Sequence, residues 1–157
     1  MSQRRANLAA VTRIFDWLKA SIAAHQTIGV ETVLSTGKYR ELVREAHARG
    51  FEVRLIYVLL KSVELNIQRV KMRVRKGGHN VPRRKIIQRR QRSLEQLPWF
   101  LENADLAWVF DNSGAKPLEI GRKEGHTILL DPKALPEVEE AVRQHFRASQ
   151  MSFGEES

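Results

Sequence analysis

The stretch from Val53 to Leu60 is almost entirely apolar, and Arg54 is its one charged residue. A continuous apolar run of this length indicates a strand covered on both faces, as strands of parallel sheets are. Segments with apolar residues at helical spacing lie on either side of it, and strands that alternate with helices predict an α/β fold with a parallel sheet. The expected strands are 28–34, 51–60 and 106–110 with a hairpin of 117–122 and 126–130, and the expected helices are 6–24, 38–49, 62–76, 82–103 and 135–147.

The positive charge of the chain is concentrated in one segment. The formal net charge is +9, from 27 Lys and Arg and 18 Asp and Glu residues. No Asp or Glu lies between Leu65 and Leu94, whereas the rest of the chain carries 16 basic residues against all 18 acidic ones. A local excess of this kind predicts an anionic ligand that binds at one place. The basic residues of the segment are Arg69, Lys71, Arg73, Arg75, Lys76, Arg83, Arg84, Lys85, Arg89, Arg90 and Arg92.

Two predicted helices, 62–76 and 82–103, carry this charge, and Gly77-Gly78 separates them. Arg69 and Arg73 are four residues apart, so they share one face of the first helix. Most of the other basic residues are expected to lie on a solvated face. Binding of nucleic acid is a second interpretation of the charge, but the segment holds no aromatic side chain except the imidazole of His79 for stacking on bases.

Arg90 lies four residues from both Ile86 and Leu94, on the stripe of its helix that should be buried. A cationic side chain on a buried face needs a partner. A bound phosphate would suit it, because a guanidinium matches phosphate oxygens with two parallel hydrogen bonds. The alternative is that Arg90 reaches the rim of the core, or pairs with an acid such as Glu31 or Asp111.

Several other classes of site are not favoured. The chain has no cysteine, which excludes disulfides, thiolate metal sites and a cysteine nucleophile. None of the five histidines is paired at metal-ligand spacing, so no metal site is expected. No apolar run is long enough for a signal peptide or a membrane span, so the protein is expected to be cytoplasmic and without a membrane partner.

Six segments together resemble the zeta-toxin-like family of P-loop kinases, in family order and spacing over roughly residues 5 to 123. The most specific part is the Gly-Gly-His-x-Val-Pro segment followed by the Arg-Arg-x-Arg-Ser-Leu segment, and each of the other pieces alone is weak. The matching segments are Gly29-Val30-Glu31-Thr32-Val33-Leu34-Ser35, Leu55-Ile56-Tyr57-Val58, Arg69-Val70-Lys71-Met72-Arg73-Val74, Gly77-Gly78-His79-Asn80-Val81-Pro82, Arg89-Arg90-Gln91-Arg92-Ser93-Leu94 and Asp111-Asn112-Ser113.

The resemblance implies a P-loop-kinase-like, three-layer parallel sheet with a helical lid. It also implies ATP-dependent phosphorylation of a small acceptor, with ATP and Mg²⁺ as cofactors and an antitoxin or a complementing chain as further partners. The domain would span residues 1–148, with the lid at about 62–103, and 149–157 would be a flexible tail.

The resemblance also assigns roles to residues of this chain. Arginines that surround a transferring phosphoryl group stabilise the charge on its oxygens. Arg73, Arg89 and Arg90 would be catalytic, and Glu31 would contact the phosphoacceptor. The nucleotide would be bound by Arg69, Arg73, His79, Asp111 and Asn112.

The chain departs from the family at its beginning. It lacks the first strand, the Gly-x-x-x-x-Gly-Lys-Ser/Thr loop that cradles phosphates and the Asp beyond it that serves as catalytic base. Thr36-Gly37-Lys38 is no substitute, because Tyr39 stands where Ser or Thr is needed. Loss of a central strand would leave two inner sheet edges and exposed apolar surface.

Three explanations for this departure are open: a truncated gene product, a degenerate inactive relative, and a separate chain that supplies the missing part. We expect little or no kinase activity from this chain itself. The alternative function is a non-catalytic basic module that binds an anionic partner, such as a nucleotide or a nucleic acid.

Overall fold

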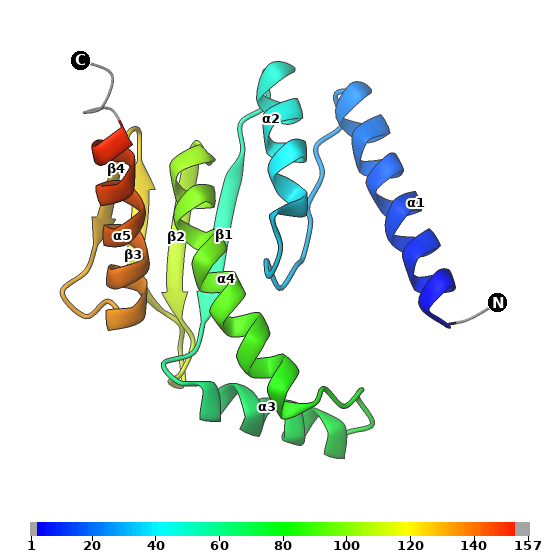
Figure 1. Cartoon of the computed structure of the whole chain (residues 1–157), viewed down its shortest axis with the longest axis vertical. Helices are drawn as coiled ribbons and strands as arrows, with labels where there is room; N and C mark the ends of the chain where they lie inside the picture. Colours follow the sequence, from blue (N-terminus) through cyan, green and yellow to red (C-terminus); the bar gives the residue numbers. More distant parts are fainter. Residues whose placement is uncertain (1–2, 153–157) are drawn as a thin grey trace. The chain divides into compact units, whose positions relative to one another are not determined.

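The computed structural model describes residues 3–152, and the side chains of residues 9–147 (Figure 1). The chain forms two compact units. The helical unit consists of the described residues up to Thr32 together with Lys38–Val53. The sheet unit consists of Val33–Gly37 together with the described residues from Arg54 onward.

The helical unit is built on α1 (Gln3–Ala23) and α2 (Arg40–Ala48), and it includes Lys38 and Tyr39 of the short 3-10 helix η1 (Gly37–Tyr39) before α2. Leu18 and Ile22 of α1 and Leu42 and Ala46 of α2 are buried against one another. Lys19 of α1 also donates a hydrogen bond of 2.6 Å to the carboxylate of Glu41. The partly buried side chains around this core are Phe15, Ile28, Tyr39, Phe51 and Val53.

The strand predicted at 28–34 is wrong, because this segment has no regular secondary structure. Its β-branched residues have the right propensity, but a strand exists only when it pairs with another strand. Val30 and Val33 are instead 42% and 55% exposed.

The sheet unit contains a four-stranded sheet with the order β1-β2-β3-β4. β1 (Arg54–Leu59) runs parallel to β2 (Leu106–Asp111), whereas β3 (Leu118–Glu124) and β4 (Thr127–Leu130) add antiparallel strands. The α/β prediction is confirmed, and so is the hairpin across Glu124-Gly125. The sheet is mixed, with one parallel pair, so the expectation of a parallel sheet is wrong for the other two pairs.

The two inner sheet edges that were expected from loss of a central strand do not occur, because β1 and β2 pair directly. Their register is continuous, from Arg54 opposite Leu106 to Leu59 opposite Asp111. Six successive residues of each strand are matched in this way. No gap therefore separates these two strands at their inner edges.

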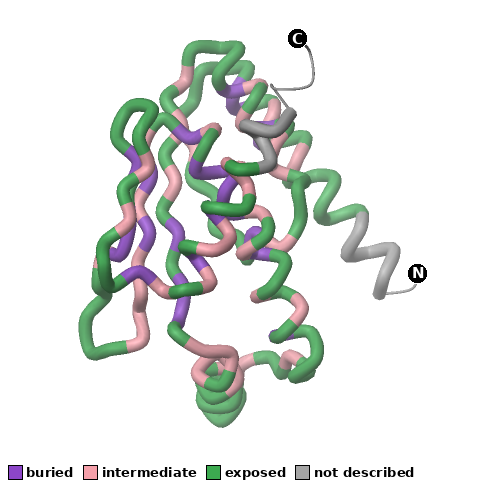
Figure 2. Tube along the Cα trace, turned by 60° about the vertical axis from the view of Figure 1, so that its left-hand side comes forward, coloured by how far each residue is buried: buried purple, intermediate pink, exposed green. Residues whose placement is uncertain are grey.

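Three helices complete the sheet unit: α3 (Val63–Arg75), α4 (Arg83–Asn103) and α5 (Pro136–Ser152). Figures 1 and 2 show α4 and α5 on one side of the sheet, with buried residues on the facing segments. Residues 149–152, predicted as part of a flexible tail, belong to α5, and residues 153–157 lie outside the described residues. The largest fully buried side chains of this core are Leu97, Leu101, Val109, Ile120 and Val138.

The expectation that β1 is covered on both faces is wrong. Tyr57 and Leu59 are buried, but Ile56 and Val58 on the other face are 67% and 53% exposed. Side chains of a strand point alternately to opposite faces. The core of the sheet unit therefore lies on one face of β1.

The end of α4 is held by Lys123, a lysine that is only 8% exposed on β3. Its ammonium donates hydrogen bonds to the carbonyl oxygens of Glu102, at 2.7 Å, and of Ala104. The last carbonyls of a helix lack partners inside the helix and carry partial negative charge. Lys123 thus caps α4 from the neighbouring strand.

Candidate functional site

Two adjoining hollows lie along α3 and form what we call the α3 groove. They share Arg69 and Arg73, and their volumes are about 550 and 320 Å³. The first hollow is lined by Arg69, Met72, Arg73, Lys76, Gly77 and Gly78, and the second by Val58, Leu59, Leu60, Asn66, Arg69, Val70 and Arg73.

The groove begins where β1 ends. The chain leaves the sheet at Leu59 and enters α3 through Ser62, whose hydroxyl accepts a hydrogen bond of 3.3 Å from the backbone N–H of Leu65. This hydroxyl satisfies a helix N–H that has no partner inside the helix. In open α/β sheets, ligands bind outside the carboxyl ends of the parallel strands, and the second hollow, which includes Leu59 and Leu60, lies at that end of β1.

The two arginines of the groove are held by carbonyl oxygens. The Arg69 guanidinium donates to the carbonyl of Asn112, and that of Arg73 donates to the carbonyl of His79 at 3.2 Å. A guanidinium has five N–H donors, so each contact uses a fraction of them. Both residues are exposed and have donors left for an anion.

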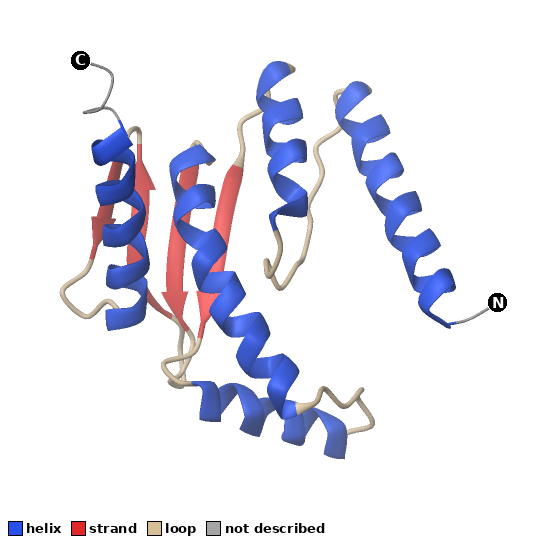
Figure 3. Ribbon diagram, viewed as in Figure 1, coloured by secondary structure: helices blue, strands red, loops and turns tan. Residues whose placement is uncertain are grey.

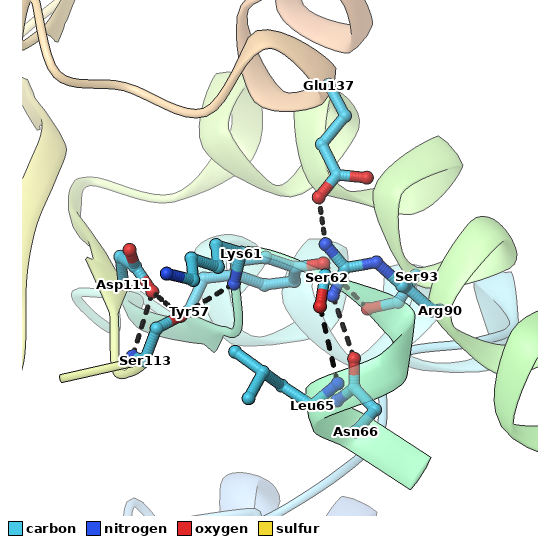
Figure 4. A network of polar contacts seen from close by, with 10 residues as sticks. All are labelled: Tyr57, Lys61, Ser62, Leu65, Asn66, Arg90, Ser93, Asp111, Ser113 and Glu137. Carbon is cyan, nitrogen blue, oxygen red and sulfur yellow. Dashed lines mark hydrogen bonds and ion pairs between the residues drawn. The ribbon is translucent and has the colours of Figure 1, made fainter. Parts of the chain in front are cut away.

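The turn after β2 supplies the carbonyl that holds Arg69. The Asn112 N–H donates to the carbonyl of Leu59 at 2.9 Å, and the Lys61 N–H donates to the Ser113 hydroxyl at 2.7 Å. The Asp111 carboxylate accepts from the N–H of Ser113 at 2.9 Å and from its hydroxyl (Figure 4). Asp111, the last residue of β2, and Asn112 and Ser113 after it thus connect the carboxyl ends of β1 and β2.

Arg90 makes a different set of contacts, shown in Figure 4. Its guanidinium donates to the side-chain oxygen of Asn66 on α3, at 2.9 Å, and forms an ion pair with Glu137 on α5. The side chain is 12% exposed, and burial lowers the pKa of this guanidinium. Arg90 therefore connects three helices through protein partners, with Glu137 in place of the acids Glu31 and Asp111 considered from the sequence.

Tyr57 lies beside this network and is buried on β1. Its hydroxyl shares a hydrogen bond of 2.9 Å with the hydroxyl of Ser93 on α4. Burial raises the pKa of Tyr57, and the hydrogen bond to Ser93 opposes this shift. Tyr57 thus joins the sheet to α4 as a neutral phenol.

The raised pKa of Tyr57 predicts a loss of stability in alkali. Above a pH of about 10 the phenol ionises in the unfolded chain but stays protonated in the folded one. The free energy of unfolding that this group contributes is therefore complete below about pH 10 and falls as the pH rises through the folded-state pKa. Urea unfolding at about pH 8 and pH 11 measures the fall. The fall should be smaller in Tyr57→Phe, and an equal fall in both proteins would contradict the prediction.

The other predicted site residues are spread over both units. Arg89 is exposed on α4, and the side chain of His79 is exposed on the loop between α3 and α4, which Figure 3 shows in tan. Glu31 is exposed in the helical unit. The structure thus brings Arg69, Arg73 and main-chain atoms of His79 and Asn112 together, and it places Arg90 in a separate network.

Sequence reasoning missed several residues of these sites. Lys76 lies three residues after Arg73, so helical spacing could have placed it in the groove. Asn66 and Glu137 gave no signal, because their pairing with Arg90 joins residues far apart in the chain.

The described residues contain neither a cluster of metal-ligating side chains nor a helix that could span a membrane. No three His, Asp or Glu side chains of these residues lie together as a metal ion would require. In the same part of the chain, no helix combines the length and apolarity needed to cross a membrane.

Comparison with known proteins shows one partial similarity. No protein-family model and no solved structure matches this chain. A protein of Haemophilus influenzae named "Uncharacterized protein" is 32% identical over 76 residues, which are 48% of this chain and 54% of that protein. The chain thus spans about half the length of this curated relative, whose name states no function.

Proposed function

We propose that this chain is an ATP-binding domain of the zeta-toxin-like kind, in which the α3 groove holds the phosphates of the nucleotide. The observation that carries the proposal is the convergence of Arg69, Arg73 and Lys76 on one hollow along α3, which shares Arg69 and Arg73 with the hollow at the carboxyl end of β1. Arg69 and Arg73 lie at i and i+4 of α3 and Lys76 follows its last residue at i+7, so their positions span about 10 Å along the helix axis.

The fit to phosphate rests on the chemistry of the lining. Guanidinium groups bind phosphate oxygens with two hydrogen bonds. Arg69 and Arg73 are also held by carbonyl oxygens, which reduces the entropy lost when a ligand binds.

We assign the remaining roles by family resemblance. Arg89 is the arginine we retain for the phosphoryl group being transferred, because the guanidinium of Arg90 already binds Asn66 and Glu137. Glu31 stays the predicted contact to a small phosphoacceptor. The 157 residues contain no Gly-x-x-x-x-Gly-Lys-Ser/Thr loop, so we expect this chain alone to bind Mg-ATP without transferring its phosphoryl group.

Calorimetric titration with Mg-ATP tests the proposal. We expect saturable binding that Arg73→Ala weakens about tenfold, or ~1.4 kcal/mol. Arg75→Ala is the matched control, because it removes the same charge from α3 but does not line the groove. It should change the affinity less than about twofold, since exposed charges at a distance are screened. Absence of saturable binding to a protein with its native helical circular dichroism would refute the proposal.

A second candidate function is the binding of a longer polyanion by the same helices. The exposed basic side chains continue beyond the groove onto the start of α4, at Arg83, Arg84 and Lys85. A single-stranded oligonucleotide would contact both regions, so its affinity should fall in Arg75→Ala as much as in Arg73→Ala and should depend steeply on salt. The same two variants therefore separate this function from nucleotide binding.

A further inference from the structure

The end of α3 has a backbone arrangement that depends on two glycines. Gly77 has a φ of +86°, in the left-handed region that favours glycine. The N–H of Gly78 donates to the carbonyl of Arg73 at 2.9 Å, and the N–H of Gly77 donates to that of Val74 at 3.0 Å. This pair of hydrogen bonds is the Schellman arrangement that ends many helices. It turns the chain back so that Gly78 lies against the helix it has just left.

Gly78 lies in close contact with the side chain of Arg73. A Cβ atom at Gly78 would be 2.6 Å from Cγ of Arg73, 3.3 Å from its Cδ and 3.0 Å from its carbonyl oxygen. The Arg73 guanidinium then donates to the carbonyl of His79, the next residue along the chain, at 3.2 Å. The stem of Arg73 thus passes over Gly78, and its charged end is held by His79.

We infer that Gly78 is a positioning residue for Arg73: its missing side chain leaves the space that lets Arg73 present its guanidinium to an anion in the α3 groove. The inference rests on the proposed function and adds to it a residue without chemistry of its own. Gly78 acts through Arg73, and His79 acts through its carbonyl oxygen rather than its imidazole.

An alanine at residue 78 would displace Arg73. The 3.0 Å contact with the Arg73 carbonyl oxygen requires a small shift of the backbone, and the shorter contact with Cγ, next to the helix, requires a change in the first side-chain torsion of Arg73. Such a change swings the whole side chain and carries the guanidinium away from the carbonyl of His79. Gly77 differs, because a Cβ there meets nothing within 4 Å and its substitution would strain the backbone alone.

The test combines the full chain and its variants in a double-mutant cycle, with Mg-ATP as the probe. We expect Gly78→Ala to weaken binding about fivefold, because the guanidinium is no longer held in place. In the Arg73→Ala background the same substitution should have no further effect, whereas in the Arg69→Ala background the fivefold loss should remain. A merely structural role in ending α3 would lower affinity in all three backgrounds.

A measurement without ligand distinguishes failure of this inference from failure of the proposed function. Nuclear Overhauser contacts between the Gly78 Hα protons and the Arg73 side chain should be present in the wild-type protein and lost in Gly78→Ala. If the wild-type protein does not bind Mg-ATP, the proposed function fails and the inference falls with it. If binding occurs but the contacts are absent, or Gly78→Ala binds as the wild type does, the inference alone is overturned.

Discussion

Replacement of Leu97 by alanine should lower the free energy of unfolding of the sheet unit by about 3 kcal/mol. Leu97 lies in the C-terminal half of α4 and is 0% exposed. The substitution removes the apolar contacts of the side chain and leaves a cavity that close-packed neighbours fill incompletely. Hydrogen exchange of the Val109 amide on β2 measures the effect, because this amide opens when the sheet unit unfolds.

Leu129→Ala is the matched control for Leu97→Ala. Leu129 is 43% exposed on β4, so its truncation removes the same atoms but creates no cavity. We expect the free energy of unfolding to fall by less than about 1 kcal/mol. Equal losses for the two leucines would contradict the position of the core between α4 and the sheet.

Arg90→Met should have the second largest effect, a loss of about 2 kcal/mol in the free energy of unfolding of the sheet unit. Methionine fills much of the space of the arginine stem but leaves Glu137 and the Asn66 side chain without their shared partner. The loss is smaller than for a fully buried ion pair, because the Glu137 side chain is 36% exposed and regains water.

A double-mutant cycle that combines Arg90→Met with Glu137→Gln identifies the source of this loss of stability. If the ion pair carries it, Arg90→Met should cost less in the Glu137→Gln background than in the wild-type protein. A direct role of Arg90 in nucleotide binding would change different measurements. Arg90→Met would then leave hydrogen exchange unchanged and weaken binding of Mg-ATP, which would contradict the assignment of Arg90 to the helix network.

Local signals in the sequence predicted the helices of the sheet unit well. The break at Gly77-Gly78 separates α3 from α4 because the left-handed conformation of Gly77 ends the first helix. Pro82 was expected as the first residue of the second helix, and the helix begins one residue later, at Arg83. Such errors are usual, since helix ends depend on caps and tertiary contacts.

Signals that depend on distant partners were harder to read. The apolar run around Ile56 and Val58 predicted a strand correctly, but the sequence does not reveal which faces of a strand are covered. The segment 28–34 has the composition of a strand, but no neighbouring strand pairs with it. Direct pairing of β1 with β2 joins Leu55 to Ala107, and no local pattern encodes a contact over such a separation.

The candidate site was predicted in part for the same reason. Arg69 and Arg73 share a face by helical spacing, and the structure places both in the α3 groove. The ion-pair partner of Arg90 is Glu137, on a helix far along the chain, which spacing on one helix does not predict. The role of Lys123 as a cap of α4 could not be predicted either, because a lysine on a hairpin strand is normally expected to be exposed to solvent.

The parallel pairing of β1 with β2 has a consequence during synthesis on the ribosome. β2 is translated after the whole of α3 and α4, so β1 emerges without the strand it will pair with. At about 5–20 residues per second, this interval lasts roughly 2 to 10 s. During that time the apolar residues Ile56, Val58 and Leu59 are available to chaperones and to other nascent chains, whereas β3 and β4 meet their neighbours almost as soon as they are made.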